Sequence, residues 1–205
     1  MRVANSLLRS TRSARRAMCA PSRQESRMSV LSMDLDERFQ KLTPARQLAV
    51  AAAAARRVLP IFASMCEDDV TPLRDGIDIV ELAARGQTFS AVDYTRAIND
   101  ITAVASADPD RAEHAVSTAV VAALEAASHN RPAALDSLAA ARLAAELFAG
   151  ADAAKDELQW QVWATSRAET AATTAPLLSG ADAPATRWQA KLQDNLPLFE
   201  QTRDA

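Results

Sequence analysis

The sequence is poor in the residues that build reactive or cross-linked sites. It contains two cysteines, two histidines and four glycines among 205 residues, and aromatic residues make up only 4% of the chain. It has no Cys-x-x-Cys pair, no glycine-rich phosphate-binding loop and no Gly-x-Ser-x-Gly motif. These absences argue against a zinc site, a nucleotide-binding loop and a serine hydrolase. We therefore expect no metal and no cofactor. An enzyme has no positive support from the sequence but is not excluded by it, and the scarcity of cysteine favours a cytoplasmic location.

Long hydrophobic runs are also missing. The two longest are Leu48–Ala55 and Val58–Cys66, and Arg56 and Arg57 separate them. Each run is shorter than the roughly 20 apolar residues that a membrane-spanning helix needs. No membrane association is expected.

Alanine is the residue that the sequence has in excess, with 47 copies. Because alanine is the best helix former and is depleted in strands, this composition predicts an all-α protein. Apolar residues recur at helical spacing, as in Leu73, Ile77, Val80 and Ala84. Short connections favour a compact antiparallel helical bundle of seven or eight helices in a single domain. We expect helices at 34–42, 44–66, 72–85, 91–106, 109–128, 132–149, 152–170 and 186–196.

Helix starts and ends are marked by capping residues. Thr43 before Pro44 and Ser90 before an apolar segment are typical of helix N-termini, and Gly86 and Gly150 are typical of C-termini. Asp108-Pro109 is interpreted in the same way as a helix start. Pro60 lies inside the second expected helix and should kink or split it.

Charge is unevenly distributed along the chain. Residues 1–33 contain seven arginines and one acid, which gives +6, whereas residues 34–205 contain 16 basic and 25 acidic groups, which gives −9. The first segment is interpreted as a disordered basic tail or a non-native extension, with a mitochondrial transit peptide as the alternative. Residues 34–205 are expected to form the bundle domain, and their acidity argues against nucleic-acid binding.

Two aromatic residues and one arginine make the most distinctive segment. Trp160, Trp163 and Arg167 share one face of the expected helix at positions i, i+3 and i+7. Since Trp and Arg anchor many interfaces, these residues are a candidate partner-binding surface. The alternative is that both tryptophans fill spaces that alanine leaves in the core.

Two further groups of residues could act together. Arg57, Arg74 and Asp78 could form a buried or half-buried structural ion-pair network, although Arg74 and Asp78 are also an ordinary i, i+4 pair. Asp110, Glu113 and His114 could share a metal, but acids in a first helical turn also stabilise the helix dipole.

Several of these segments together resemble a known family. Leu42, Gln47-Leu48-Ala49, Arg57-Val58-Leu59-Pro60-Ile61-Phe62, Arg74 with Asp78, and Glu157 with Trp160-Gln161-Val162-Trp163 resemble the YjaG-like family of small all-helical bacterial proteins. The Arg-Val-Leu-Pro segment is also similar to one in helical immunity proteins, which neutralise bacterial toxins. The resemblance implies a helical fold and no transferable catalytic residues.

These observations lead to one main hypothesis and two alternatives. The chain is expected to be a non-enzymatic helical binding or regulatory protein with an unidentified protein partner, and it could also form a homodimer. The first alternative is an immunity protein that binds a basic toxin through complementary charge. The second is a metal-binding or enzymatic protein that uses Asp110, Glu113 and His114.

Overall fold

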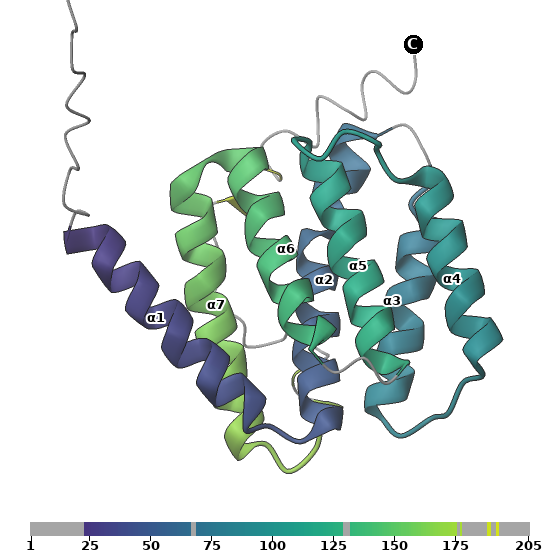
Figure 1. Cartoon of the computed structure of the whole chain (residues 1–205), viewed down its shortest axis with the longest axis horizontal. Coiled ribbons are helices and arrows are strands. Elements are labelled where there is room, and N and C mark those ends of the chain that lie inside the picture. The colour runs from purple at the N-terminus through teal and green to yellow at the C-terminus, as the bar shows by residue number, and fades with distance from the viewer. Residues whose placement is uncertain are drawn as a thin grey trace, which may run out of the picture.

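The chain folds into α-helices joined by short connections. The computed structural model describes residues 23–66, 69–128, 132–175, 177, 188–189 and 192, and within these residues it contains seven helices and no strand. The helices are α1 (Arg23–Gln40), α2 (Pro44–Met65), α3 (Thr71–Ala84), α4 (Ala91–Val104), α5 (Ala112–Ala127), α6 (Ala133–Ala149) and α7 (Ala151–Thr170). Successive helices run in opposite directions (Figure 1). The predicted all-α antiparallel bundle is therefore confirmed.

Helix α2 is the centre of the bundle. It packs against α3, α5, α6 and α7, and α5 and α6 form the most extensive helix pair. At the two edges, α4 packs against α3 and α5, and α1 packs against α7 (Figure 1). By length and composition α2 could cross a membrane, but eleven of its residues are buried among the other helices. An apolar helix of this kind is what the core of a helical bundle requires.

Small side chains let the central helices approach closely. Six alanines of α5 are buried, at positions 112, 115, 119, 122, 123 and 126. Ser137 of α6 is also buried, and its hydroxyl donates a hydrogen bond of 2.8 Å to the carbonyl oxygen of Ala119. The excess of alanine thus serves backbone packing between α5 and α6.

Several predicted helix ends are confirmed. Pro44 occupies the first turn of α2. Ser90 caps α4 in a capping box, because Asp93 N donates to Ser90 Oγ and Ser90 N donates to Asp93 Oδ2. Gly86 and Gly150 follow α3 and α6 with φ of 92° and 86°, a backbone conformation that glycine adopts most easily.

Two expected helix starts, and the expectation for Pro60, differ from the structure. Helix α1 begins at Arg23 instead of 34, so part of the expected tail is helical. Helix α5 begins at Ala112 instead of 109, because Asp108 caps a turn: its Oδ1 accepts a hydrogen bond of 3.0 Å from Asp110 N. Helix α2 continues through Pro60, which lies exposed on the outside of the bundle.

Some expectations fall outside the described residues. These are the structure of residues 1–22 and most of the helix expected at 186–196. Residues 188, 189 and 192 are described and are helical.

Candidate functional site

A buried ion pair joins α2 to α7. Arg57 Nε and Nη2 each lie 3.4 Å from Glu157 Oε2. The Glu157 side chain is fully buried, and the Arg57 side chain is 10% exposed. The Arg57 guanidinium carbon also lies 4.3 Å from the centroid of the Trp160 ring and 5.7 Å from that of Trp188. Both distances are within cation–π range, so the arginine is stabilised by a carboxylate and by two indoles.

Burial dominates the electrostatics of this pair. It raises the pKa of Glu157, and the charge of Arg57 opposes the increase, with smaller contributions from the side chains of Trp188 and Gln161. Burial also lowers the pKa of Arg57, against the attraction of Glu157. Because the carboxylate has no exposure to solvent, a dissolved substrate cannot reach it. We interpret the pair as a structural connection between helices.

A second set of polar contacts extends the connection to α6. Gln161 lies one turn after Glu157 on α7 and is also fully buried. Its Nε2 donates a hydrogen bond of 2.9 Å to the Leu138 carbonyl, and its Oε1 accepts one of 2.9 Å from Arg142 Nη1. These roles of Glu157 and Gln161 were not predicted from the sequence. The sequence contains one signal for them: Glu157 and Gln161 are four residues apart, so they share a helix face with Trp160 and Ala164.

The predicted Trp160–Trp163–Arg167 surface is divided between the core and the exterior. Trp160 is only 2% exposed, whereas Trp163 is half-buried and Arg167 is exposed. The two indole centroids are 6.3 Å apart, and the Arg167 guanidinium carbon lies 5.8 Å from the Trp163 ring. Trp160 therefore fills the core beside Arg57 and is not accessible to a partner. Only Trp163 and Arg167 stay available at the surface.

The predicted network of Arg57, Arg74 and Asp78 is also rearranged. Asp78 Oδ1 lies 2.6 Å from Arg56 Nη2, and Glu81 Oε1 lies 2.6 Å from Arg56 Nε. Arg74 is exposed on α3. Since consecutive helical residues point about 100° apart, Arg56 reaches α3 while Arg57 reaches α7. One arginine doublet thus connects α2 to two different helices.

The candidate metal ligands are held by separate interactions. Asp110 precedes α5, Glu113 is buried and pairs with Arg111 at 2.5 Å, and His114 Nδ1 lies 2.6 Å from the Ser106 carbonyl oxygen. Among the described residues, no three His, Cys, Asp or Glu side chains are grouped so that they could hold a metal ion. The turn around Asp108 separates residues that a continuous helix would have brought together.

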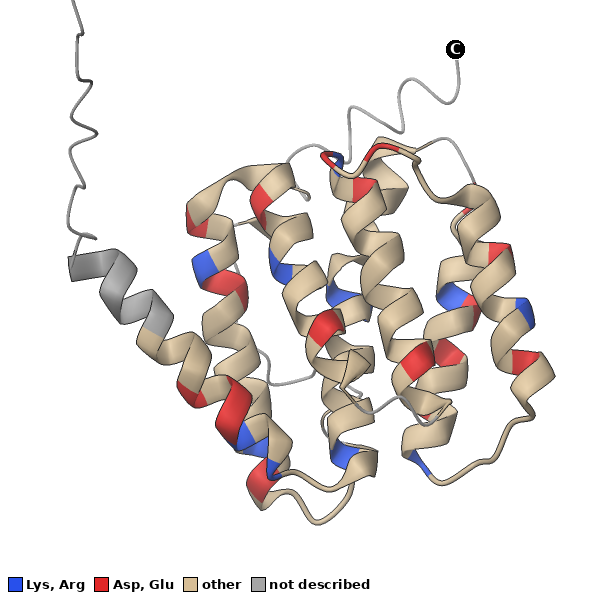
Figure 2. Cartoon of the chain, in the orientation of Figure 1, with Lys and Arg blue, Asp and Glu red and all other residues tan. Residues whose placement is uncertain are grey.

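A groove between α3 and α4 has an acidic border and an apolar floor. Its volume is about 360 Å³. Pro72, Ile79, Phe89 and Ala97 provide its apolar surface, and Asp69, Asp75, Asp93, Asp100 and Arg96 provide its charged groups. Four carboxylates and one guanidinium give this groove a net charge of −3. Figure 2 shows acidic positions of α4 on both sides of its basic position.

Two of the groove carboxylates also accept hydrogen bonds at the starts of helices. Asp93 belongs to the capping box of α4, and hydrogen bonds from Ser90 lower its pKa. Asp69 precedes α3, and hydrogen bonds from Thr71 lower its pKa. Both groups are therefore ionised at neutral pH, and their positions are fixed by the ends of the helices. The groove was not predicted from the sequence, because its acidic residues come from three separate segments.

Comparison with known proteins identifies no relative of this chain. No protein-family model, curated protein or solved structure matches this chain. The resemblance to the YjaG-like family and to helical immunity proteins stays a prediction.

Proposed function

We propose that the protein is a non-enzymatic binding protein that recognises a basic protein partner through the groove between α3 and α4. The observation that supports this proposal is the composition of the groove, in which four aspartates surround an apolar floor. A lysine or arginine side chain has an apolar stem and a cationic head. Such a side chain can place its stem against Ile79 and Phe89 while its head meets the carboxylates.

The charge of residues 34–205 supports the same partner class. Residues 34–205 carry a net charge of −9. A negative field accelerates the encounter with a positively charged partner and disfavours acidic competitors. The association rate should therefore fall as salt is added, since the Debye length shrinks to about 3 Å at 1 M.

Neutralisation of a toxin is one form that this function could take. An immunity protein binds and blocks a specific toxin, and a basic nuclease would be complementary to the α3–α4 groove in charge. Inhibition of the captured partner's activity by the purified protein would distinguish this form from regulation or scaffolding. A toxin gene adjacent to relatives of this protein would support it, and consistent absence of such a gene would count against it.

An affinity experiment with matched charge reversals tests the proposal. The groove variant is Asp75→Lys with Asp100→Lys, and the control is Asp136→Lys with Glu146→Lys on α6. All four residues are exposed, and both variants change the net charge by the same amount. The wild-type chain and the control should enrich the same basic protein from the native host, and the groove variant should lose it. Equal enrichment by all three chains would contradict the proposal.

The oligomeric state and the compartment are separate proposals. Large apolar residues that are exposed on α1 and α6 could contribute to a homodimer; they are Val30, Leu31, Met33, Leu143 and Leu147. Light scattering on the purified protein distinguishes a monomer from a dimer.

A cytoplasmic location is proposed because cysteine is scarce, and fractionation of the host cell tests it.

A further inference from the structure

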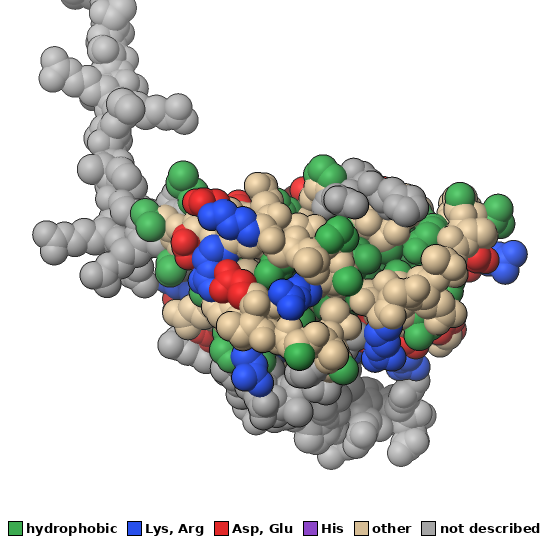
Figure 3. Space-filling model, turned by 90° about the horizontal axis from the view of Figure 1, so that it is seen from below, with side chains coloured by type: hydrophobic (Ala, Val, Ile, Leu, Met, Phe, Trp, Pro, Cys, Tyr) green, Lys and Arg blue, Asp and Glu red, His purple; other side chains and the backbone are tan. Residues whose placement is uncertain are grey.

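A second cavity lies where α2 begins and α3 ends. Its volume is about 350 Å³, and residues from α2 to α6 line it. This end of the bundle is at the bottom of Figure 1. Figure 3 views the molecule from there and shows apolar side chains between charged ones. The volume is within the range of about 300–1,000 Å³ that is typical of small-molecule sites.

The lining residues that the structure describes are neutral. They include Leu48 and the alanines at 83, 126, 127 and 134, and none of the described lining residues has a charged side chain. A charged ligand would lose its hydration there without meeting an opposite charge, which is costly. The cavity therefore favours an uncharged molecule.

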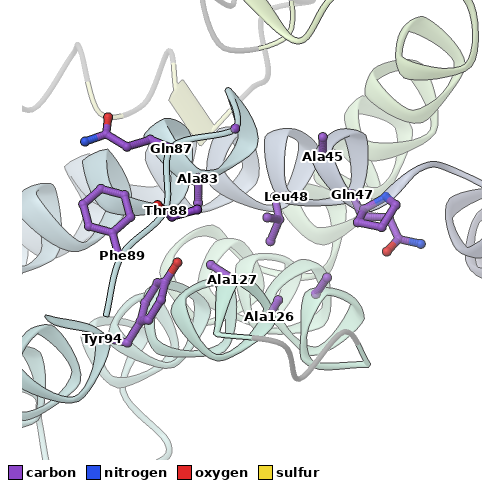
Figure 4. Close-up of a pocket in the computed structure, with 13 residues that line it drawn as sticks. Ala45, Gln47, Leu48, Ala83, Gln87, Thr88, Phe89, Tyr94, Ala126 and Ala127 are labelled. Atoms are coloured by element: carbon purple, nitrogen blue, oxygen red, sulfur yellow. The ribbon is translucent and has the colours of Figure 1, made fainter. Parts of the chain in front are cut away.

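Aromatic rings form one wall of the cavity. Phe89 and Tyr94 pack edge to face, with ring centroids 6.0 Å apart and planes inclined by 66°. Figure 4 shows both rings at one side of the cavity, with Ala126 and Ala127 across from them. An aromatic wall facing small side chains suits a flat ring, because aromatic pairs gain energy from stacking and edge contacts.

The Tyr94 hydroxyl is a hydrogen-bond donor directed into the cavity. Tyr94 is 7% exposed, and its hydroxyl points toward Thr88 and Ala127 in Figure 4. Within the described part of the chain this hydroxyl makes no hydrogen bond. By contrast, the Gln47 amide nitrogen already donates to the carbonyls of Phe39 and Gln40, at 3.1 and 3.3 Å. Burial and the charge of Asp93 raise the pKa of Tyr94, so the phenol keeps its proton.

We infer that this cavity binds a small, neutral aromatic molecule that accepts a hydrogen bond from Tyr94. The inference does not depend on the proposed protein partner, because the described lining residues of the cavity and of the acidic groove have only Phe89 in common. Phe89 lines both spaces. A ligand that packs against this ring should also stabilise the start of α4.

Two matched probe molecules test the inference on the full chain. Acetophenone has an aromatic ring and a carbonyl acceptor, whereas ethylbenzene has the same shape without the acceptor. Binding is measured by amide chemical shifts in NMR titrations of the wild type and of Tyr94→Phe. Acetophenone should give saturable shifts at the lining residues and bind Tyr94→Phe about three- to tenfold more weakly, as expected for one neutral hydrogen bond. Ethylbenzene should bind both proteins equally.

A cavity-filling variant tests where the probe binds. Ala83→Leu adds volume inside the cavity, and Ala103→Leu adds the same volume on the exposed face of α4. Acetophenone binding should be lost in the first variant and kept in the second, with circular dichroism confirming that both are folded. Absence of saturable shifts in the wild type would overturn the inference, as would equal acetophenone affinity of Tyr94→Phe and the wild type.

Discussion

The interior where α2 meets α7 and the edge formed by α4 use charge in opposite ways. In the interior, Arg57 and Glu157 are buried and paired. At the edge, Asp93, Arg96 and Asp100 border a groove that is open to solvent. Helix α2 has eleven buried residues, whereas α4 has two, Tyr94 and Ile101. This difference indicates that stability is concentrated in the interior, and the proposed binding of a basic partner assigns recognition to the edge.

Substitutions in the interior should lower the free energy of unfolding more than substitutions at the edge. Arg57→Ala would leave the Glu157 carboxylate buried without this cation, and removing one partner of a buried pair typically costs about 3–5 kcal/mol. That loss is a large part of the 5–15 kcal/mol by which a domain of this kind is stable. Urea unfolding followed by circular dichroism measures it. Arg57→Ala combined with Glu157→Gln should recover part of the loss, and a cost below about 1 kcal/mol for the single variant would contradict the assigned role.

The contact of α3 with the α4 edge and with α5 should tolerate little extra volume. Gly76 of α3 is buried, and a Cβ there would lie 2.8 Å from Ile101 Cδ1 and 3.1 Å from Val120 Cγ1. Alanine gains about 1 kcal/mol over glycine in helix propensity, but overpacking costs about 1–3 kcal/mol. We expect Gly76→Ala to lower the free energy of unfolding by roughly 1 kcal/mol. An increase of similar size would mean that Ile101 moves aside freely, which would sharpen the view of α4 as a loosely held edge.

The start of α4 should depend on its capping box. Ser90→Ala removes the hydroxyl that accepts from Asp93 N, and loss of such a cap typically costs about 1 kcal/mol. The effect should be confined to α4, as measured by amide hydrogen exchange. Thr95→Ala, on the exposed side of the same helix, is the control and should have little effect. Equal effects of the two variants would show that the cap does not stabilise the edge.

The smallest expected effect is a change in pH dependence. Because burial raises the pKa of Glu157, the folded state takes up a proton before the unfolded state as the pH falls. The contribution of Glu157 to stability should therefore increase as the pH decreases through its folded pKa, and then level off below its unfolded value. Urea unfolding of the wild type and Glu157→Gln from pH 7 to pH 5 isolates this contribution. If the free energy of unfolding of Glu157→Gln increased relative to that of the wild type at lower pH, the pKa of Glu157 would be lowered in the folded state and not raised.

Local sequence signals predicted much of the fold. Ser90 and Gly86 mark helix ends by their own backbone and side-chain chemistry, and the spacing of Leu73, Ile77 and Val80 marks a buried face. Asp108-Pro109 was misleading, because aspartate before proline is typical of both a helix start and a turn. In this chain the Asp108 side chain bonds to Asp110 N and stabilises the turn.

The candidate sites depend on pairings that no local pattern specifies. Arg57 and Glu157 are 100 positions apart. Arg57 pairs with Glu157 and not with Asp78 because its side chain points from α2 toward α7. The groove likewise combines Asp69, Asp75 and Asp100 from different segments. Packing of the helices creates both arrangements, so the sequence supplies the residue types but not their partners.

Residue-resolved hydrogen exchange under native conditions tests the contrast between interior and edge most directly. It measures the free energy of opening at each amide, from local fluctuations up to global unfolding. The amides of α4 should exchange through openings that need much less free energy than global unfolding, whereas those of α2 and α5 should exchange only when the whole domain unfolds. If the protected amides of α4 exchanged at the same free energy as those of α5, the edge would be part of the rigid core and the central claim would be contradicted.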